Sequence, residues 1–199
     1  MRLIETGLPG LALLEPKVFR DERGFFLETY NEAAFAALGI HAHFVQDNHA
    51  YSSQKNVLRG MHFQRPPFAQ SKLVWVVRGS VLDVAIDLRR GSPTYGEHYG
   101  VELSAENMLR LFVPKGFAHG YITLTADTEF LYKVDAPYAP QADAGLLWND
   151  LDIGIAWPCE APVLSPKDHL HPRFKDFASP FVYEPPLADA KNAATNPKT

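Results

Sequence analysis

The chain has 199 residues, of which 46% are hydrophobic and 21% are charged, and its formal net charge is −4. This length and composition suit a single globular domain with a sizeable core. The acidic balance argues against nucleic acid as the main partner, because proteins that bind phosphate backbones usually carry a basic excess.

Cysteine usage and apolar runs predict a cytoplasmic protein. Cys159 is the only cysteine, so an internal disulfide is impossible and a reducing compartment fits. Gly7, Pro9 and Gly10 interrupt the N-terminal segment before a signal-like apolar core can form. No apolar run approaches the roughly 20 residues that span a bilayer, so we expect no membrane partner.

The first elements in chain order are a short helix and a pair of strands. In residues 31–39 (NEAAFAALG), Asn31 can cap the first turn and Gly39 can end the helix. The pattern of residues 72–89 predicts two strands joined by a turn at residues 78–80. The second strand alternates with a period of two, which is typical of β-structure. Its two sets are Leu82, Val84, Ile86 and Leu88, and Val81, Asp83, Ala85 and Asp87.

Strand patterns continue through segments 108–114, 119–125 and 128–134. The sixteen prolines and thirteen glycines fit many turns and short strands. These features predict an all-β fold, an antiparallel sandwich or barrel with a jelly roll among the candidates. Residues 185–199 lack apolar periodicity, so we expect a single domain over residues 1–184 and a disordered C-terminal tail.

A cupin-like histidine motif suggests a metal site, but two of the expected metal ligands are replaced in this sequence. The segment VPKGFAHG resembles the second motif of the cupin superfamily. The first cupin motif normally supplies two histidines two residues apart and a glutamate seven residues before a glycine. Here Gln64 follows His62 at the second position, and Lys72 lies seven residues before Gly79. An ammonium group has no lone pair for a metal, so we expect no bound metal.

Both His62 and Lys72 have simpler interpretations. A lone histidine in a strand is often a buried structural residue. A lysine within an apolar strand is uncommon unless it is paired or functional. An edge-strand lysine that blocks aggregation is the alternative for Lys72.

Eight segments in order resemble the 3,5-epimerases of dTDP-4-keto-6-deoxyglucose, the third-step enzymes of dTDP-L-rhamnose synthesis. They run from about residue 19 to residue 168. The segments are DERGFFLETYN, FVQDNHAYSS, VLRGMHFQ, AQSKLVWVVRGSVLDVAIDLRRGSPTYG, GVELSAENMLRLFVPKGFAHGY, EFLYK, LLWNDLDIGIAW and LSPKD. The resemblance implies a cupin-type antiparallel jelly roll with a few short peripheral helices, a homodimer, and no metal or organic cofactor.

The resemblance also implies catalytic roles for four residues. In a 4-keto sugar, loss of the proton at C3 or C5 gives an enolate, and inversion needs a base on one face and an acid on the other. His62 matches the family's base, and an imidazole suits proton abstraction near neutrality. Asp168 matches its carboxylate partner and Tyr132 the acid. Lys72 matches a cation near the C4 oxygen, where it would stabilise developing negative charge.

Three of the implied site residues have structural alternatives. Tyr132 also fits as an aromatic strand residue. Asp168 lies in a loop with proline and lysine, where aspartate is commonly solvated or turn-forming. His119 could brace the turn after Gly116, although its family counterpart contacts substrate.

For the nucleotide diphosphate, the resemblance points to five residues, and three more fall at or near family binding positions. The five are Arg23, Glu28, Gln46, Asn48 and Arg59, and the three are Tyr138, Asp143 and Lys167. Arginine suits phosphate because its guanidinium is a rigid fork of donors. Asp143 departs from the glutamate of many relatives. Arg23 and Glu28 belong to an N-terminal segment that reaches the neighbouring subunit in this family; simple surface exposure is the alternative for Arg23.

The positions of Arg59 and His62 conflict with a regular strand. Residues three apart point to opposite faces of an unbroken strand. Either Gly60 marks a bulge or twist between them, or Arg59 serves a site at the subunit interface. The sequence leaves both possibilities open.

Three functions fit these observations. The first is epimerisation of a dTDP-4-keto-6-deoxyhexose at C3 and C5. The second is epimerisation of a related sugar nucleotide at one centre only, since such relatives share the same His, Asp and Lys set. The third is a non-catalytic cupin that binds a nucleotide sugar.

Overall fold

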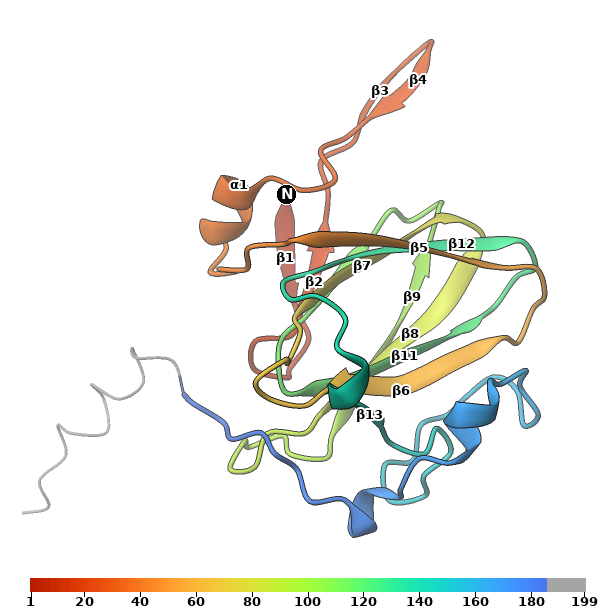
Figure 1. Cartoon of the computed structure of the whole chain (residues 1–199). Coiled ribbons are helices and arrows are strands. Elements are labelled where there is room, and N and C mark those ends of the chain that lie inside the picture. The colour runs from red at the N-terminus through yellow and green to blue at the C-terminus, as the bar shows by residue number, and fades with distance from the viewer. Residues whose placement is uncertain (186–199) are drawn as a thin grey trace, which may run out of the picture.

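In the computed structural model, which describes residues 1–185, the chain folds as two antiparallel sheets that face each other (Figure 1). The six-stranded sheet contains, in spatial order, β1 (Arg2–Glu5), β2 (Ala12–Glu15), β10 (Arg110–Val113), β7 (Lys72–Arg78), β12 (Thr128–Val134) and β5 (Gln46–Ser52). The five-stranded sheet contains β13 (Asp143–Gly145), β6 (Leu58–Gln64), β11 (Phe117–Thr123), β8 (Ser80–Asp87) and β9 (His98–Ser104).

Smaller elements surround this sandwich. Strands β3 (Phe19–Asp21) and β4 (Gly24–Phe26) form a hairpin that projects from the body (Figure 1). The helical elements are α1 (Glu32–Ala36) and the 3₁₀ turns η1 (Pro140–Ala142), η2 (Pro166–His169) and η3 (Phe174–Asp176). No helix within residues 1–185 is long and apolar enough to cross a membrane.

The predicted all-β fold with a few short helices is confirmed. Asn31 caps α1 by accepting a hydrogen bond from the backbone N–H of Ala34, and Gly39 after the helix has a φ of +81°. The predicted strands about Gly79 are β7 and β8, and the turn carries the chain from one sheet to the other. The single-domain boundary at residue 184 stays a prediction, since residues 186–199 of the expected tail lie outside the described residues.

Strand β8 is buried on both faces, which explains why its period-two pattern is apolar on one side and mixed on the other. Val81 and Ala85 belong to the core between the sheets. Val84 and Ile86 face the other way, where the C-terminal segment covers the sheet with residues such as Phe181. The mixed set therefore carries two fully buried carboxylates toward the interior, Asp83 and Asp87.

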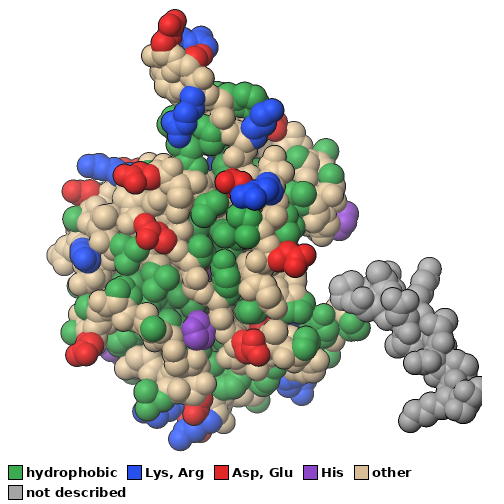
Figure 2. All heavy atoms as spheres, turned by 180° about the vertical axis from the view of Figure 1, so that it is seen from behind, with side chains coloured by type: hydrophobic (Ala, Val, Ile, Leu, Met, Phe, Trp, Pro, Cys, Tyr) green, Lys and Arg blue, Asp and Glu red, His purple; other side chains and the backbone are tan. Residues whose placement is uncertain are grey.

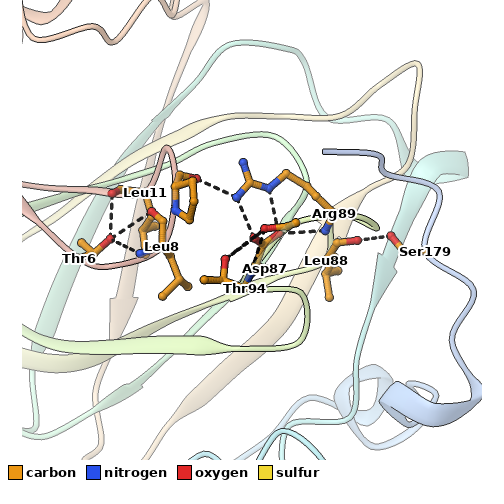
Figure 3. A network of polar contacts seen from close by, with 10 residues as sticks. Thr6, Leu8, Leu11, Asp87, Leu88, Arg89, Thr94 and Ser179 are labelled. Atoms are coloured by element: carbon orange, nitrogen blue, oxygen red, sulfur yellow. Dashed lines mark hydrogen bonds and ion pairs between the residues drawn. The ribbon is translucent and has the colours of Figure 1, made fainter. Parts of the chain in front are cut away.

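Asp87 at the end of β8 is the centre of a polar network (Figure 3). Its carboxylate accepts hydrogen bonds from Arg89 Nε and Nη2, both at 2.8 Å, from Ser92 Oγ at 2.6 Å and from Thr94 Oγ1 at 2.8 Å. Arg89 Nη2 also donates to the carbonyl of Pro9 at 2.7 Å. Burial raises the pKa of Asp87, but the hydrogen bonds outweigh it and hold that pKa below its ordinary value.

We expect Asp87→Asn to lower the free energy of unfolding by about 3 kcal/mol, because it leaves the nearly buried Arg89 guanidinium without its counter-charge. Denaturant titration at pH 7 measures this loss. Because the pKa of Asp87 is lowered on folding, its contribution is complete above about pH 4 and is lost as the pH falls through the folded value. The gap between wild type and variant should therefore close in acid. Glu15→Gln, which breaks an exposed pair with Arg2, is the control and should change little.

Candidate active site

A cavity of about 470 Å³ lies between the two sheets. Its lining comes from β5, β6, β7, β11 and β12 and from two further segments, one before β6 and one that includes η2. The lining residues are Ala50, Val57, Leu58, Arg59, His62, Lys72, His119, Tyr121, Phe130, Tyr132, Val163, Leu164, Ser165, Lys167 and Asp168. All four predicted catalytic residues are therefore in one cavity.

A bulge in β6 brings Arg59 and His62 to the same cavity. His62 pairs with His119 and Arg59 pairs with Tyr121, so two residues of β6, Gly60 and Met61, lie opposite one residue of β11, Gly120. Gly60, in the bulge, has a φ of +140°, and a Cβ there would lie 2.6 Å from the Cα of Gly120. Only glycine fits this conformation and this close approach. The bulge that the sequence left open is present, and through it Arg59 reaches the cavity that His62 lines.

His62 is paired with a buried carboxylate. Its Nε2 lies 2.5 Å from Oδ1 of Asp168, which is in η2, and Oδ2 of the same carboxylate accepts from Ser165 Oγ at 2.8 Å. Burial raises the pKa of Asp168, but the His62 hydrogen bond and charge, with Ser165, hold that pKa below its ordinary value. An ionised Asp168 requires Nε2–H to donate, which leaves the imidazole lone pair on Nδ1.

A second, deeper pair lies beside the first. His119 Nε2 is 2.9 and 3.0 Å from the two carboxylate oxygens of Asp83, and both residues are buried. The rings of Tyr121 and Phe130 stack between the two sheets with centroids 4.0 Å apart. Asp83 holds His119 against the cavity, and the stacked rings form its apolar wall.

Lys72 and Tyr132 lie on the opposite, six-stranded sheet. Burial lowers the pKa of Lys72 to about 8, although the charges of Asp83 and Asp143 act in the other direction. Burial also raises the pKa of Tyr132, which a nearby Arg59 partly offsets. Lys72 thus carries a positive charge at neutral pH, and Tyr132 keeps its proton.

The predicted binding residues fall into three groups. Gln46 and Asn48 are joined by a 2.8 Å hydrogen bond and alternate along β5 with exposed residues, on the same face as the cavity residue Ala50. Arg59 donates from Nη2 to the carbonyl of Tyr51 at 3.3 Å.

The second group lies at the cavity edge, where Asp143 accepts a hydrogen bond from Tyr138 at 3.3 Å and pairs with Lys167. The third group, Arg23 and Glu28, lies outside the cavity lining of a single chain. Arg23 is in the turn between β3 and β4, where it pairs with Asp21.

A family model described as dTDP-4-dehydrorhamnose 3,5-epimerase matches residues 5–176. The chain belongs to this family. The dTDP-4-dehydrorhamnose 3,5-epimerase of Salmonella typhimurium is 53% identical over 174 residues, which cover 86% of this chain and 94% of that protein. The predicted family and its enzyme class, an isomerase, are confirmed.

Solved structures of family members share the fold. The enzyme from Bacillus anthracis, with TDP and PPi bound, aligns with a TM-score of 0.85 at 47% identity, over 87% of this chain and 99% of that one. The enzyme from Legionella pneumophila, in complex with dTDP-4-keto-L-rhamnose, aligns with a TM-score of 0.88 at 41% identity, over 92% of this chain and 99% of that one. The predicted cupin-type fold is confirmed.

Sequence reasoning missed several residues in or next to this candidate site. Asp83 was visible only as a carboxylate at an alternating position in an apolar strand, a signal of a buried partner. Ser165 and His171 gave no signal, because they approach Asp168 through the conformation of an irregular segment. His171 Nε2 lies 3.8 Å from Asp168 Oδ1, and its ring meets that of His62 edge-on, with centroids 5.6 Å apart.

Proposed function

We propose that this enzyme converts dTDP-4-keto-6-deoxy-D-glucose to dTDP-4-keto-L-rhamnose by epimerisation at C3 and C5, as a step of dTDP-L-rhamnose biosynthesis. The observation that carries the proposal is the placement of His62 and Tyr132 on opposite sheets of one cavity. A sugar ring between the sheets would meet a base on one face and an acid on the other, which inversion requires. The product bound to the Legionella relative supports the substrate class.

Each residue then has one chemical task. His62 removes the proton at C3 or C5, and the Asp168 carboxylate stabilises the imidazolium that forms. The electron pair moves onto the C4 oxygen, where the Lys72 ammonium stabilises the negative charge of the enolate. Tyr132 donates a proton to the opposite face of the carbon, and the inverted centre results.

The test is to incubate the protein with dTDP-4-keto-6-deoxyglucose in deuterated water and to follow C3 and C5 by NMR. Deuterium entering both carbons with inversion supports the proposal. Exchange at one carbon alone would select a single-centre epimerase instead. Absence of exchange above background would reject both enzymatic functions for this substrate and leave the nucleotide-sugar-binding cupin.

We expect Tyr132→Phe to separate exchange from inversion. Without the phenol, His62 can still remove a proton and return deuterium to the same face, so exchange continues while inverted product falls by about 10²-fold or more. NMR measures both quantities in one sample. An equal loss of exchange and inversion would contradict the role of Tyr132 as the acid.

We propose that the active form is a homodimer in which Arg23 and Glu28 of the N-terminal hairpin serve the neighbouring cavity. Phe25 and Phe26 of the hairpin are 58% and 67% exposed. With Trp75 and Met108, they line an apolar groove of about 280 Å³. Hydrophobic side chains gather on this face below the projecting hairpin (Figure 2), as expected of a subunit interface.

Mixing two inactive variants tests this arrangement. We expect Arg23→Ala and His62→Ala chains, co-refolded, to recover exchange, because in the mixed dimer one cavity receives His62 from its own chain and an intact Arg23 from the other. Each variant refolded alone is the control. Failure of the mixture to exceed the sum of the two would contradict a shared site.

We also propose a cytoplasmic location, which the single cysteine supports, since secreted domains commonly carry disulfides.

A further inference from the structure

His171 is a largely buried histidine that the proposed reaction does not use. Its side chain is 12% exposed, and its Nε2 is inaccessible to solvent and has no hydrogen-bond partner among the described residues. Such a buried polar atom normally has a partner, because leaving it unsatisfied costs free energy. Oδ1 of Asp168 lies 3.8 Å from this nitrogen, which is beyond hydrogen-bond distance.

His171, His62 and Asp168 together offer the ligands of a transition-metal ion. One ligand atom from each residue lies within 4.8 Å of the other two. Because Ser165 holds Oδ2 of Asp168, Oδ1 is the oxygen directed at both imidazoles. Two imidazoles and a carboxylate with an open fourth position are a common zinc set.

The charges nearby are compatible with a cation at this ligand set. A carboxylate and two imidazoles bind a transition-metal ion in their deprotonated forms. The adjacent cation, Lys167, is paired with Asp143, which reduces its repulsion of a metal ion.

We propose that His62, Asp168 and His171 form an inhibitory Zn²⁺ site. The ion would replace the proton that His62 and Asp168 share, and His171 would supply the third ligand. For tetrahedral coordination, the 2.5 Å separation of His62 Nε2 and Asp168 Oδ1 widens to about 3.3 Å and the 3.8 Å separation of His171 Nε2 and Oδ1 shrinks to a similar value. The inhibition rests on the proposed role of His62, whereas the binding does not.

The binding test compares two histidines two residues apart. Zn²⁺ titration calorimetry and the visible absorption of Co²⁺ are measured on the tag-free full chain, on His171→Asn and on His169→Asn. His169 is exposed and lies outside the ligand cluster, so it is the matched control. We expect one ion per chain, affinity about tenfold or more weaker in His171→Asn, and no change in His169→Asn. Circular dichroism checks that each variant is folded.

Activity gives the second readout. We expect Zn²⁺ to stop deuterium exchange in proportion to site occupancy, with recovery when a chelator is added, and His171→Asn to need a correspondingly higher Zn²⁺ concentration. Equal Zn²⁺ affinity in wild type and His171→Asn would overturn the site, and full exchange by the Zn²⁺-loaded protein would overturn the inhibition. Zn²⁺ binding that depends on His171 in a protein that never exchanges substrate would reject the proposed function and retain the site.

Discussion

Replacing His62 with Ala is expected to lower the rate of deuterium exchange at C3 and C5 by about 10²- to 10⁴-fold, the range that a positioned general base contributes. Asp168 holds the His62 imidazole in one tautomer, which leaves a free lone pair on Nδ1 to accept the proton. Without it, proton abstraction falls to whatever water in the cavity can achieve. NMR of the substrate in deuterated water, followed over hours, measures the residual rate.

Binding of dTDP should survive the same substitution, because the proposed nucleotide contacts come from Arg59, Gln46 and Asn48. Calorimetry with dTDP is the check that the cavity is intact. His43→Ala, at an exposed histidine outside the cavity lining, is the matched control and should exchange normally. A His62→Ala enzyme that turned over at the wild-type rate would remove His62 from the base role.

Lys72→Met is expected to lower exchange by about 10²- to 10³-fold, the usual loss when one charge-stabilising group of an oxyanion site is removed. The charge on the C4 oxygen develops only as the C–H bond breaks, so the effect should appear in kcat rather than in KM. Because burial lowers the pKa of Lys72 to about 8, wild-type kcat should fall as the pH rises through this value and the ammonium becomes neutral. The variant should lack this alkaline decline.

The control for Lys72 is Lys55→Met, at an exposed lysine outside the cavity lining. Stability provides a further readout: Lys72→Met removes a charge that burial disfavours, so the variant should unfold at equal or higher denaturant concentration while its activity falls. An unchanged alkaline profile in Lys72→Met would assign that titration to another group.

Local patterns were sufficient to predict the fold class and several elements of the fold. The alternation in residues 81–88, the glycine at position 79 and the cap at Asn31 are short-range signals, and each has the predicted structure. Which face of β8 points to the core between the sheets was harder to predict, because a strand covered on both sides has no polar, exposed face in its pattern. The partners of Asp83 and Asp87 depend on strands and loops distant in sequence, which periodicity does not report.

Some residues of the candidate site could also be found from the sequence, whereas others depend on how distant segments fold. His62 and Lys72 lie on strands and were singled out by their place in the altered cupin motif, whereas Tyr132 and the catalytic roles of all three came from the family resemblance. Asp168 was nominated by resemblance, since its contact with His62 depends on the path of an irregular segment 106 residues further along the chain. His171 was missed for that reason. The shared cavity of Arg59 and His62 depends on a one-residue insertion relative to β11, which only the pairing register reveals.

The stack of Tyr121 on Phe130 joins the sheet that carries His62 to the sheet that carries Tyr132. Facing sheets pack about 10 Å apart, and the side chains between them set that spacing. These two rings therefore act as a spacer that fixes how thick a substrate ring can be while still meeting both the proposed base and the proposed acid. A change in sugar preference within this scaffold can thus arise through the aromatic spacer, with every proton-transferring group left in place.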